Sequence, residues 1–430
     1  MRRNPPAVGT IVTIIRQAGQ ARFCGIGSLN LWSLLMRGPV RPPVLLSYVA
    51  FVLVGVSAGV SGVLLVPQMR DYGVDRAIIG ITFFTTSAGF VLASLSSGAL
   101  IHRFGVRIVL TVGGITYVLS ALYLATRPPF VAFVLVQVIM GYGIGMLESG
   151  LNAYLVALPD ARTLLNRLHA FFGVGALIGP ALAAWITGFA SWPVVWLVLA
   201  VTCVPLVVGF LVAYPALRPA DPAADATETA GIPAAAEGSM MRAALRDRGV
   251  LLGAAMLAVY VGIELGVGNW AFSYLVQARA LSGSLAGWSV SGYWLGLTVG
   301  RFLISPIAVR IGATTARMMY ACLTGVTAAA VAAWLSPAAG LATASLVLLG
   351  FFLGPIFPTT IGAVAQLTPP RLTPTAIGVM NAASLVGGAA LPWLAGTIAQ
   401  STGIWIILPF AVALAVLQFI VWSPLARRVR

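Results

Sequence analysis

The sequence contains no lysine, and only ten of its 430 residues are acidic. Because the Gly-x-x-x-x-Gly-Lys phosphate-binding loop requires a lysine, a P-loop nucleotide hydrolase is excluded. The three cysteines stand far apart without the spacing of a metal site, and we interpret them as small apolar residues. A nucleophile elbow and a cluster of metal-binding residues are also missing from the sequence. We therefore expect neither an enzyme nor a cofactor.

Charged residues make up 8% of the chain, hydrophobic residues make up 60%, and the mean hydropathy is +0.99. A soluble domain of this length does not have such a composition, so we predict an all-α membrane protein that crosses a lipid bilayer many times. Twelve apolar stretches are long enough to cross about 30 Å of hydrocarbon. They lie near residues 45–67, 78–101, 108–126, 130–156, 168–189, 193–214, 249–275, 285–305, 315–335, 339–365, 374–398 and 402–423.

The positive charge comes entirely from 25 arginines, which are distributed unevenly. Twenty lie in the first 43 residues, the even-numbered loops and the tail, and four lie in the odd-numbered loops. By the positive-inside rule, both termini are expected in the cytoplasm. The net charge of +15 then reflects membrane topology, and nucleic-acid binding is not expected. The lysine-free, alanine-, glycine- and arginine-rich composition is typical of a bacterium with GC-rich DNA, so we expect the bacterial cytoplasmic (inner) membrane.

The predicted spans form two groups of six, in residues 44–214 and 249–423. The linker between them, residues 215–248, is rich in proline, alanine and acidic residues, a composition that does not form a core. A basic tail follows at 424–430. Residues 1–43 are a basic cytoplasmic segment that could form an interfacial helix. The alternative is that natural translation starts at Met36.

The two halves look like copies of one another. A shift of 207 residues places Gly89 on Gly296, and the segment Arg103–Gly105 on Arg310–Gly312. Several glycine matches at nearly one offset indicate a structural repeat. Parallel six-helix halves suit alternating access, in which two bundles rock about a site near the middle of the membrane.

The segment between spans 2 and 3 carries a recognisable motif. It reads Gly98-Ala-Leu-Ile-His102-Arg103-Phe-Gly105-Val-Arg107. This resembles the Gly-x-Leu-x-Asp-Arg-x-Gly-Arg-Arg/Lys loop of the major facilitator superfamily. The resemblance implies a secondary transporter with two pseudo-symmetric six-helix bundles.

In that family the loop is a cytoplasmic charge latch that holds one conformation. The resemblance therefore implies a gating role for His102, Arg103 and Arg107, and for Arg310 at the matching place in the second half. Here His102 replaces the family's aspartate, and a valine replaces a basic residue. The latch is then weakened or sensitive to protonation of His102, or the loop is only a tight glycine turn.

A narrower resemblance is to the fucose–proton symporters. It rests on four patches: Glu148-Ser-Gly-Leu-Asn152, Arg167-Leu-His169, Tyr260-Val-Gly-Ile-Glu264 with Trp270, and Trp294-Leu-Gly296 with Gly300-Arg301. The resemblance implies uptake of a sugar with protons. Those symporters also carry an aspartate late in span 1, where this chain has no acid between Ser61 and Pro67. Glu264 could replace it, because Glu264 falls opposite Ser57 in the pseudo-repeat.

Glu148 and Glu264 are the two acidic residues within the predicted spans. A carboxylate in hydrocarbon costs roughly 2.5–3.5 kcal/mol on insertion scales, so it usually faces an internal cavity and has a function. Asn152 lies one helical turn after Glu148 and is a candidate solute ligand. Because burial favours the neutral acid, Glu148 is our candidate for coupling proton movement to solute movement. The alternative is a purely structural pairing of Glu148 with His169 or Arg301.

Glu264 lies near the middle of span 7 and is followed by Asn269 and Trp270. An acid, an amide and an indole at similar depth resemble a sugar site, in which polar groups bind hydroxyls and the ring stacks on the sugar. Asn381 in span 11 is a further candidate hydroxyl ligand. Glu264 is also a candidate proton site, and alternatively it forms a salt bridge with Arg301.

Arg301 is a permanent cation inside span 8 and therefore needs a partner. A gate salt bridge is our first interpretation, and anion recognition or snorkelling to the lipid headgroups are alternatives. His169, near the start of span 5, is either a proton-coupling residue or an interfacial residue. Gln137 is interpreted as a helix–helix contact.

These observations predict a secondary active transporter that takes up a sugar or a similar hydroxylated solute, with the proton as coupling ion. No obligate protein partner is expected. The segment Gly175-x-x-x-Gly179-Pro180 partly matches a motif of proton-driven exporters, so export of apolar or amphiphilic compounds is the alternative. A non-transporting membrane sensor is a remote alternative from a different class.

Overall fold

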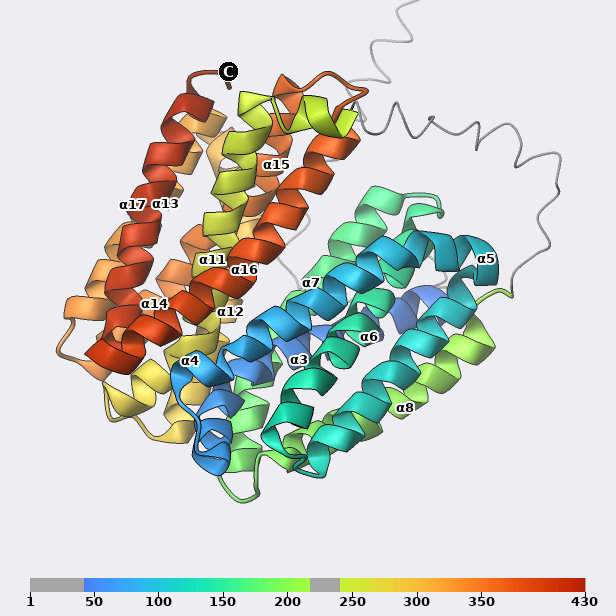
Figure 1. Cartoon of the computed structure of the whole chain (residues 1–430). Helices are drawn as coiled ribbons and strands as arrows, with labels where there is room; N and C mark the ends of the chain where they lie inside the picture. Colours follow the sequence, from blue (N-terminus) through green and yellow to red (C-terminus); the bar gives the residue numbers. More distant parts are fainter. Residues whose placement is uncertain (1–41, 217–239, 430) are drawn as a thin grey trace, which may run out of the picture. The chain divides into compact units, whose positions relative to one another are not determined.

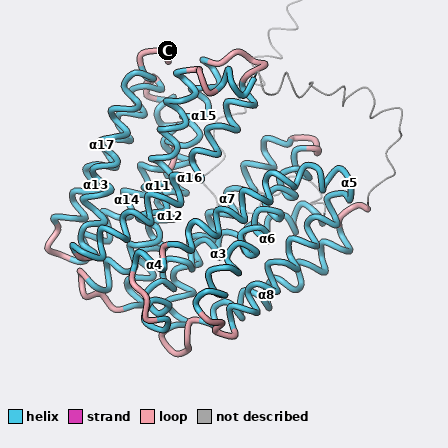
Figure 2. The backbone as a smooth tube through the Cα atoms, viewed as in Figure 1, coloured by secondary structure: helices cyan, strands magenta, loops and turns pink. Residues whose placement is uncertain are grey.

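Helices joined by short loops make up almost all of the described chain, as Figure 2 shows. The computed structural model describes residues 42–216 and 240–429. The basic segment up to residue 41, the alternative start at Met36 and most of the predicted linker lie outside the described residues. Residues from Pro43 onward form one unit.

Two groups of helices follow one another along the chain (Figure 1). The first contains α3 (Pro42–Tyr72), α4 (Arg76–Ile79), α5 (Ile81–Ala125), α6 (Phe130–Val156), α7 (Ala161–Thr187) and α8 (Pro193–Ala213). The second contains α11 (Arg248–Gln277), α12 (Gly283–Arg310), α13 (Thr315–Leu335), α14 (Ala339–Leu353), α15 (Ile356–Leu367), α16 (Thr373–Thr402), the short η1 (Ile404–Ile406) and α17 (Ile407–Ala426). We call them the first and second bundle.

Eleven helical segments of the described chain are long and apolar enough to cross a membrane. One of them, Arg76–Ala125, has 50 residues, or about 75 Å at 1.5 Å per residue, which is more than twice the hydrocarbon thickness. It reverses at Gly105, whose φ of 79° and ψ of 159° are not helical. This segment therefore contains two spans, and the predicted count of twelve is confirmed.

Gly105 also refines the prediction for the segment between spans 2 and 3. We expected a loop there, but the chain is helical on both sides of this single residue. A backbone with positive φ is accessible to glycine without the steric cost that a β-carbon brings. Gly312, its counterpart in the repeat, also has a positive φ, of 66°. The two halves thus turn in the same way at the same place.

The predicted span at 339–365 is a broken helix rather than a continuous one. It divides between α14 and α15 at Gly354 and Pro355. Proline supplies no backbone N–H, and its ring disfavours a continuous helix. Gly354 lies against the backbone of α12 at Arg301, so the break occurs where two helices approach closely.

The repeat is confirmed by matching helix contacts in the two bundles. A β-carbon at Gly89 would overlap the carbonyl oxygen of Val138, so α5 and α6 touch backbone to backbone. A β-carbon at Gly296 would overlap the carbonyl oxygen of Val347, so α12 and α14 touch in the same way. Close packing through small residues is typical of membrane helices.

In each bundle a side-chain tie at the C-terminal end of the first helix bonds the chain where the third span ends, in the following loop in the first bundle and in the last turn of α13 in the second. In the first bundle, the Tyr72 hydroxyl donates to the Pro128 carbonyl at 2.9 Å. In the second, the Arg279 guanidinium donates to the carbonyls of Ala333 at 3.0 Å and Trp334 at 2.6 Å. Arg279 stands 207 residues after Tyr72, so the tie occupies one position of the repeat.

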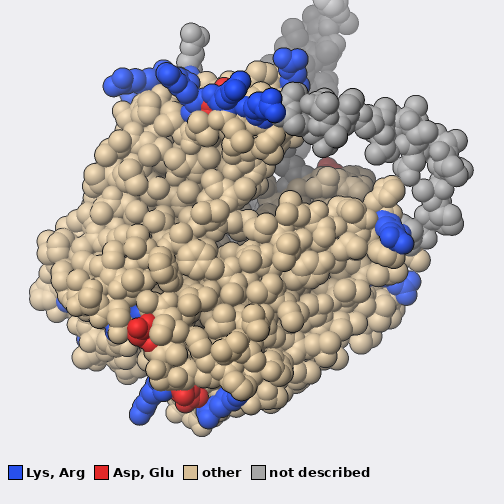
Figure 3. All heavy atoms as spheres, viewed as in Figure 1, with Lys and Arg blue, Asp and Glu red and all other residues tan. Residues whose placement is uncertain are grey.

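The outer surface matches a protein in hydrocarbon. Figure 3 shows charged residues gathered towards the two ends of the visible face, with a broad uncharged band between them. Many large apolar side chains are exposed along the helices, among them Leu95, Val212, Leu119 and Ile420. Exposed apolar surface of this extent is expected where lipid is the solvent.

Candidate functional site

The two bundles touch along α7 and α12. A β-carbon at Gly287 would lie 3.0 Å from the Pro180 carbonyl oxygen, and the Ala181 N–H donates to the Ser291 hydroxyl at 3.2 Å. Further along, the α-carbon of Gly173 faces Thr298, leaving no room for a side chain. The helices are therefore in contact at Gly173 and from Pro180 to Ala184, while the turns of α7 up to Ala176 border a cavity.

At that contacting end, a second set of bonds joins the bundles, which we call the Arg76 latch. The Arg76 guanidinium donates to the side-chain oxygen of Gln277 at 2.8 Å and to the carbonyl of Ala399 at 3.4 Å. The Gln400 side-chain oxygen accepts from the Arg76 N–H at 3.2 Å. Gln277 ends α11 and Ala399 lies near the end of α16, where a helix dipole attracts a cation.

Trp393 reinforces this latch. Its indole N–H donates to the Ala77 carbonyl at 3.1 Å, and its ring meets Phe84 edge-on at 5.7 Å. Both partners belong to the first bundle, whereas Trp393 lies on α16. The latch therefore combines a cation, amide acceptors and an aromatic contact across the two bundles.

Replacing Arg76 with glutamine is expected to weaken the contact between the two bundles at the Arg76 latch. Loss of the guanidinium removes the attraction to two helix ends and three hydrogen bonds, to Gln277, Ala399 and Gln400, so the state opened at the latch becomes more populated. The readout is the labelling rate of a cysteine introduced at Ser61, after the three native cysteines are removed, with an impermeant thiol reagent applied on the latch side. We expect a rate several times that of the parent protein. Arg70→Gln, an exposed arginine at the same end, is the control, and equal rates in the two variants would contradict the prediction.

Among residues 42–216 and 240–429, two cavities are lined by helices of both bundles. The larger, of about 410 Å³, lies between the early turns of α7 and the later turns of α12, and we call it the α7–α12 cavity. Asn166, His169 and Phe172 line it from the first bundle. Trp294 and Arg301 line it from the second.

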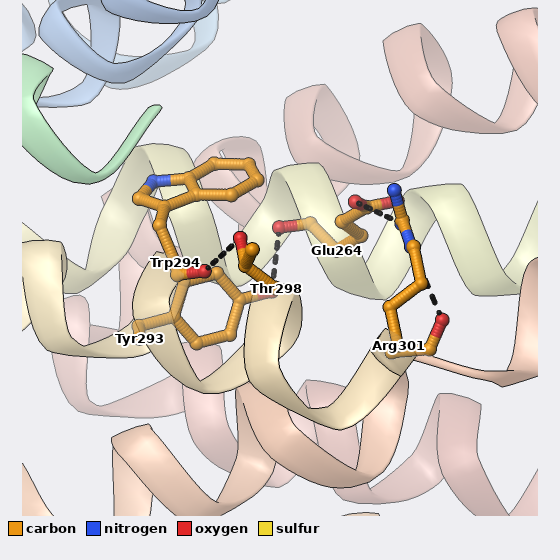
Figure 4. Close-up of polar contacts among 6 residues, drawn as sticks. Glu264, Tyr293, Trp294, Thr298 and Arg301 are labelled. Atoms are coloured by element: carbon orange, nitrogen blue, oxygen red, sulfur yellow. Dashed lines mark hydrogen bonds and ion pairs between the residues drawn. The ribbon is translucent and has the colours of Figure 1, made fainter. Parts of the chain in front are cut away.

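Glu264 and Arg301 meet within the second bundle (Figure 4). Arg301 Nη2 lies 3.8 Å from Glu264 Oε1, and the Arg301 and Glu264 side chains are 31% and 15% exposed. Arg301 Nε also donates to the Gly354 carbonyl at 3.3 Å, and the Tyr293 hydroxyl donates to the Glu264 backbone carbonyl at 2.9 Å. The predicted pairing of these charges thus joins α11 to α12 and does not cross between bundles.

His169 faces the same cavity from α7. Its side chain is exposed, and its ring meets the ring of Phe51 edge-on at 5.4 Å. Arg301 lines the same cavity from α12. The structure therefore brings His169 and Arg301 together from different bundles.

The smaller cavity, of about 210 Å³, lies among α3, α5, α6 and α11, and we call it the α3–α6 cavity. Asn269 lines it as predicted, and Ser57, Ser61, Thr86 and Gln137 contribute further polar groups. None of the residues that border it in the described chain is charged. Gln137, which we interpreted as a helix–helix contact, is therefore also part of a cavity wall.

Glu148 continues the cavity-facing side of α6. Gln137, Met140 and Ile144 line the cavity, and Glu148 is the next residue at helical spacing, about 6 Å further along the axis. Its side chain is half-buried, and the structural pairing with His169 or Arg301 is not found among the described residues. The Asn152 side chain donates to the Glu148 backbone carbonyl at 2.8 Å. The Asn152 amide is therefore not a hydrogen-bond partner of the Glu148 carboxylate.

Trp270 and Asn381 lie away from the cavities. The Trp270 side chain has no exposed surface, and its indole N–H donates to the Pro392 carbonyl at 2.8 Å. In this conformation it packs α11 against α16 and is not open to stack on a solute. Asn381 is exposed on α16, seven residues before the cavity-lining Gly388 and so on the same side of the helix.

The predicted gating residues surround the two glycine turns. His102 and Arg103 are exposed, and the Arg103 guanidinium lies over the Phe104 ring at 5.2 Å from its centre. Arg107 is half-buried on the other side of the turn, and Arg310 is exposed in the last turn of α12. They stay candidates for gating.

The sequence patterns did not indicate two features of the site, the Arg76 latch and the cavity-lining hydroxyl residues. Sequence reasoning counted Arg76 only as a loop charge, although a basic residue directly after the helix N-cap Asp75 could have indicated an ordered position. Hydroxyl residues inside apolar spans, such as Ser57 and Ser61, were also not chosen. They are common in membrane helices, where many bond their own backbone, as Ser61 does at 3.0 Å, so the sequence offers little to single them out.

Comparison with known proteins now identifies the class. The family model described as Major Facilitator Superfamily matches residues 47–283 and 266–430. This chain belongs to the Major Facilitator Superfamily, and it is a membrane transporter rather than an enzyme. The fold predicted from the sequence is confirmed.

Several individual proteins are similar. Bypass of stop codon protein 6 of Saccharomyces cerevisiae is 27% identical over 408 residues, which cover 85% of this chain and 78% of that protein. A glucose/galactose transporter of Brucella abortus is 26% identical over 374 residues, or 79% of this chain and 84% of that protein. A multidrug resistance protein B homolog of Mycobacterium tuberculosis is 27% identical over only 157 residues, or 35% and 29%.

Among solved structures, the nucleoside transporter NupG, in a mutant form, aligns with a TM-score of 0.73. The alignment covers 89% of this chain and 100% of NupG at 16% sequence identity. This likeness shows the fold alone.

Proposed function

We propose that this transporter takes up a sugar or a similar neutral hydroxylated solute together with protons. The observation that carries the proposal is the wall of the α3–α6 cavity, where hydroxyl and amide groups gather without a charged residue. The amides donate and accept hydrogen bonds, and the Ser61 and Thr86 hydroxyls, which donate to carbonyls of their own helices, still accept from the hydroxyls of a sugar. An uncharged wall also favours a neutral solute over an ion.

The size of this cavity supports a small solute. Pockets for drug-sized ligands measure about 300–1,000 Å³, whereas the α3–α6 cavity measures about 210 Å³. A monosaccharide-sized solute matches this volume better than a bulky amphiphile does. The similarity to a protein named glucose/galactose transporter, at 26% identity, supports the same solute class.

Glu148 supports proton coupling. It lies one turn beyond the cavity on the same side of α6, and its carboxylate has no ion pair within the described ranges. A carboxylate without a cationic partner is driven towards its neutral form by an apolar environment. In the proposed cycle, protonation of Glu148 removes its charge and lets the bundles rearrange around the solute.

The arginine distribution supports an orientation for this cycle. Twenty arginines on the side of the termini favour the cytoplasm there, which places the Arg76 latch on the opposite, periplasmic side. The latch then closes the periplasmic end, and the α7–α12 cavity lies towards the cytoplasm. We propose the bacterial inner membrane as the location.

The test is a pH measurement outside proteoliposomes in lightly buffered solution while a panel of sugars is added. We expect alkalinisation with one sugar or a narrow group of sugars, because protons enter with the solute. Protein-free liposomes give the baseline. Absence of a response to every sugar, with proton-driven efflux from vesicles loaded with a cationic dye, would replace uptake by export.

Export is the second candidate, and the partial match to a multidrug resistance protein homolog favours it. The span 5 motif adds little, because packing accounts for its glycines. The α-carbons of Gly175 and Gly179 lie against the backbone of α3, at Val52 and Gly59. A helix contact this close requires small residues whichever direction transport takes.

A further inference from the structure

The Arg301 guanidinium has hydrogen-bonding capacity that its protein partners do not use fully. The 3.8 Å between Arg301 Nη2 and Glu264 Oε1 exceeds the about 2.7–2.9 Å of a charge-assisted hydrogen bond. The Gly354 carbonyl accepts a hydrogen bond from Arg301 Nε at 3.3 Å. About a third of the Arg301 side chain is exposed, and the residue lines the α7–α12 cavity. A half-buried permanent cation with open donors is suited to bind an anion.

The facing wall supplies donors from the other bundle. Asn166 and His169 of α7 line the cavity opposite Arg301, and both side chains are exposed. An amide and an imidazole each offer an N–H to an acceptor, and the imidazole does so in its neutral form as well. Thr298 does not add a donor, because its hydroxyl donates to the Trp294 carbonyl at 2.9 Å (Figure 4).

Four aromatic residues also line the cavity. Phe172 lines it from the first bundle, and Trp294, Phe302 and Phe357 line it from the second. Rings prefer to pack edge-to-face or offset against other rings, so these walls favour a planar aromatic body. The volume of about 410 Å³ falls within the range of about 300–1,000 Å³ for small organic ligands.

We propose that the α7–α12 cavity binds a small aromatic carboxylate, with the carboxylate between Arg301 and His169 and the ring between the aromatic walls. A cation would leave the unused Arg301 donors without an acceptor. A neutral sugar would leave the guanidinium donors and the aromatic walls without matched partners. A phosphate dianion would face a single permanent cation that Glu264 partly neutralises already.

Such a ligand would join the two bundles, since His169 lies on α7 and Arg301 on α12. It would therefore favour the state in which the early part of α7 approaches α12. This inference is independent of sugar uptake: the α3–α6 cavity could bind sugar whether or not the second cavity binds an acid. The two proposals can thus fail separately.

The test compares four probes by calorimetry on the purified full-length protein in detergent: benzoate, benzamide, acetate and benzylammonium. Benzamide keeps the ring and removes the charge, acetate keeps the charge and removes the ring, and benzylammonium reverses the charge. We expect saturable benzoate binding that is at least about tenfold tighter than that of the other three probes. Equal binding of benzoate and benzamide, or no benzoate binding, would overturn the proposal.

Variants localise the site. Arg301→Gln is expected to weaken benzoate binding by about tenfold or more. The single change leaves Glu264 without its cation and could destabilise the fold. The double variant Glu264→Gln with Arg301→Gln keeps the local charge balanced, so it is included to separate loss of binding from loss of stability. Arg317→Gln, an exposed arginine in the first turn of α13, is the control for net charge. Undiminished benzoate binding in the double variant would rule out Arg301 as the anion site, whereas loss confined to the Arg301 variants and to His169→Leu would establish it.

Discussion

Glu148→Gln is expected to abolish sugar-driven proton uptake while leaving the protein folded. Glutamine has nearly the shape of the neutral acid, so it imitates a permanently protonated Glu148 and cannot release or take up a proton. The carboxylate makes no ion pair among the described residues, so its loss leaves no cation unpaired. The measurement is the pH change outside proteoliposomes as sugar is added, which should fall to the level of protein-free liposomes.

Solute exchange separates coupling from binding. A variant locked in the protonated form should still exchange labelled for unlabelled sugar across the membrane, because exchange requires no net proton movement. Asp160→Asn is the matched control, since Asp160 is an exposed carboxylate in the loop after the same helix. If Glu148→Gln proteoliposomes still alkalinise the medium at the parental rate, Glu148 is not the coupling residue, although sugar uptake itself would stand.

Gly89→Ala and Gly296→Ala are each expected to destabilise the protein severely. Each added methyl group would overlap a backbone carbonyl oxygen of the neighbouring helix, that of Val138 or Val347. Ordinary overpacking costs about 1–3 kcal/mol, and a clash with backbone falls at or above the upper end because a side-chain rotation cannot relieve it. Thermal unfolding with size-exclusion chromatography should show a lower transition temperature and less monodisperse protein.

The control comes from glycines with open space. A β-carbon at Gly266 or Gly378 would meet nothing within 4 Å, so alanine there should be neutral or stabilise the helix by up to about 1 kcal/mol. The two pairs of substitutions therefore differ in sign as well as in size. Equal behaviour of Gly296→Ala and Gly266→Ala would show that the α12–α14 contact is looser than described.

Sequence patterns predict the fold well because the lipid bilayer constrains the sequence directly. Apolar run length, arginine placement and the spacing of glycines each respond to the membrane or to close helix contacts. The details that the patterns missed are local backbone events: a single positive-φ glycine at Gly105 replaces an expected loop, and Gly354 and Pro355 divide one span into two helices. A hydropathy pattern does not distinguish a broken helix from a straight one.

The site is harder to predict because rotation about a helix axis decides what a residue faces. Glu264 and Asn269 are five residues apart, which is about 140° around a helix, so they lie on different sides of α11. Glu264 meets Arg301 on α12, whereas Asn269 lines the α3–α6 cavity. Trp270, one residue later, faces α16 and is fully buried. Neighbouring helices determine these outcomes, and a single sequence does not show which helices are neighbours.

The paired ties at Tyr72 and Arg279 have a consequence for how the halves diverged. Both residues bond the carbonyls at the end of the third span, but one does so with a phenol and the other with a guanidinium. The two halves present backbone carbonyls at nearly the same place, since Pro128 corresponds to Leu335 in the repeat and the second tie ends at Ala333 and Trp334. Any donor of sufficient length then satisfies them, so selection retains the geometry of the bond and not the residue. At this position a matching bond therefore marks the repeat although the side chains no longer match.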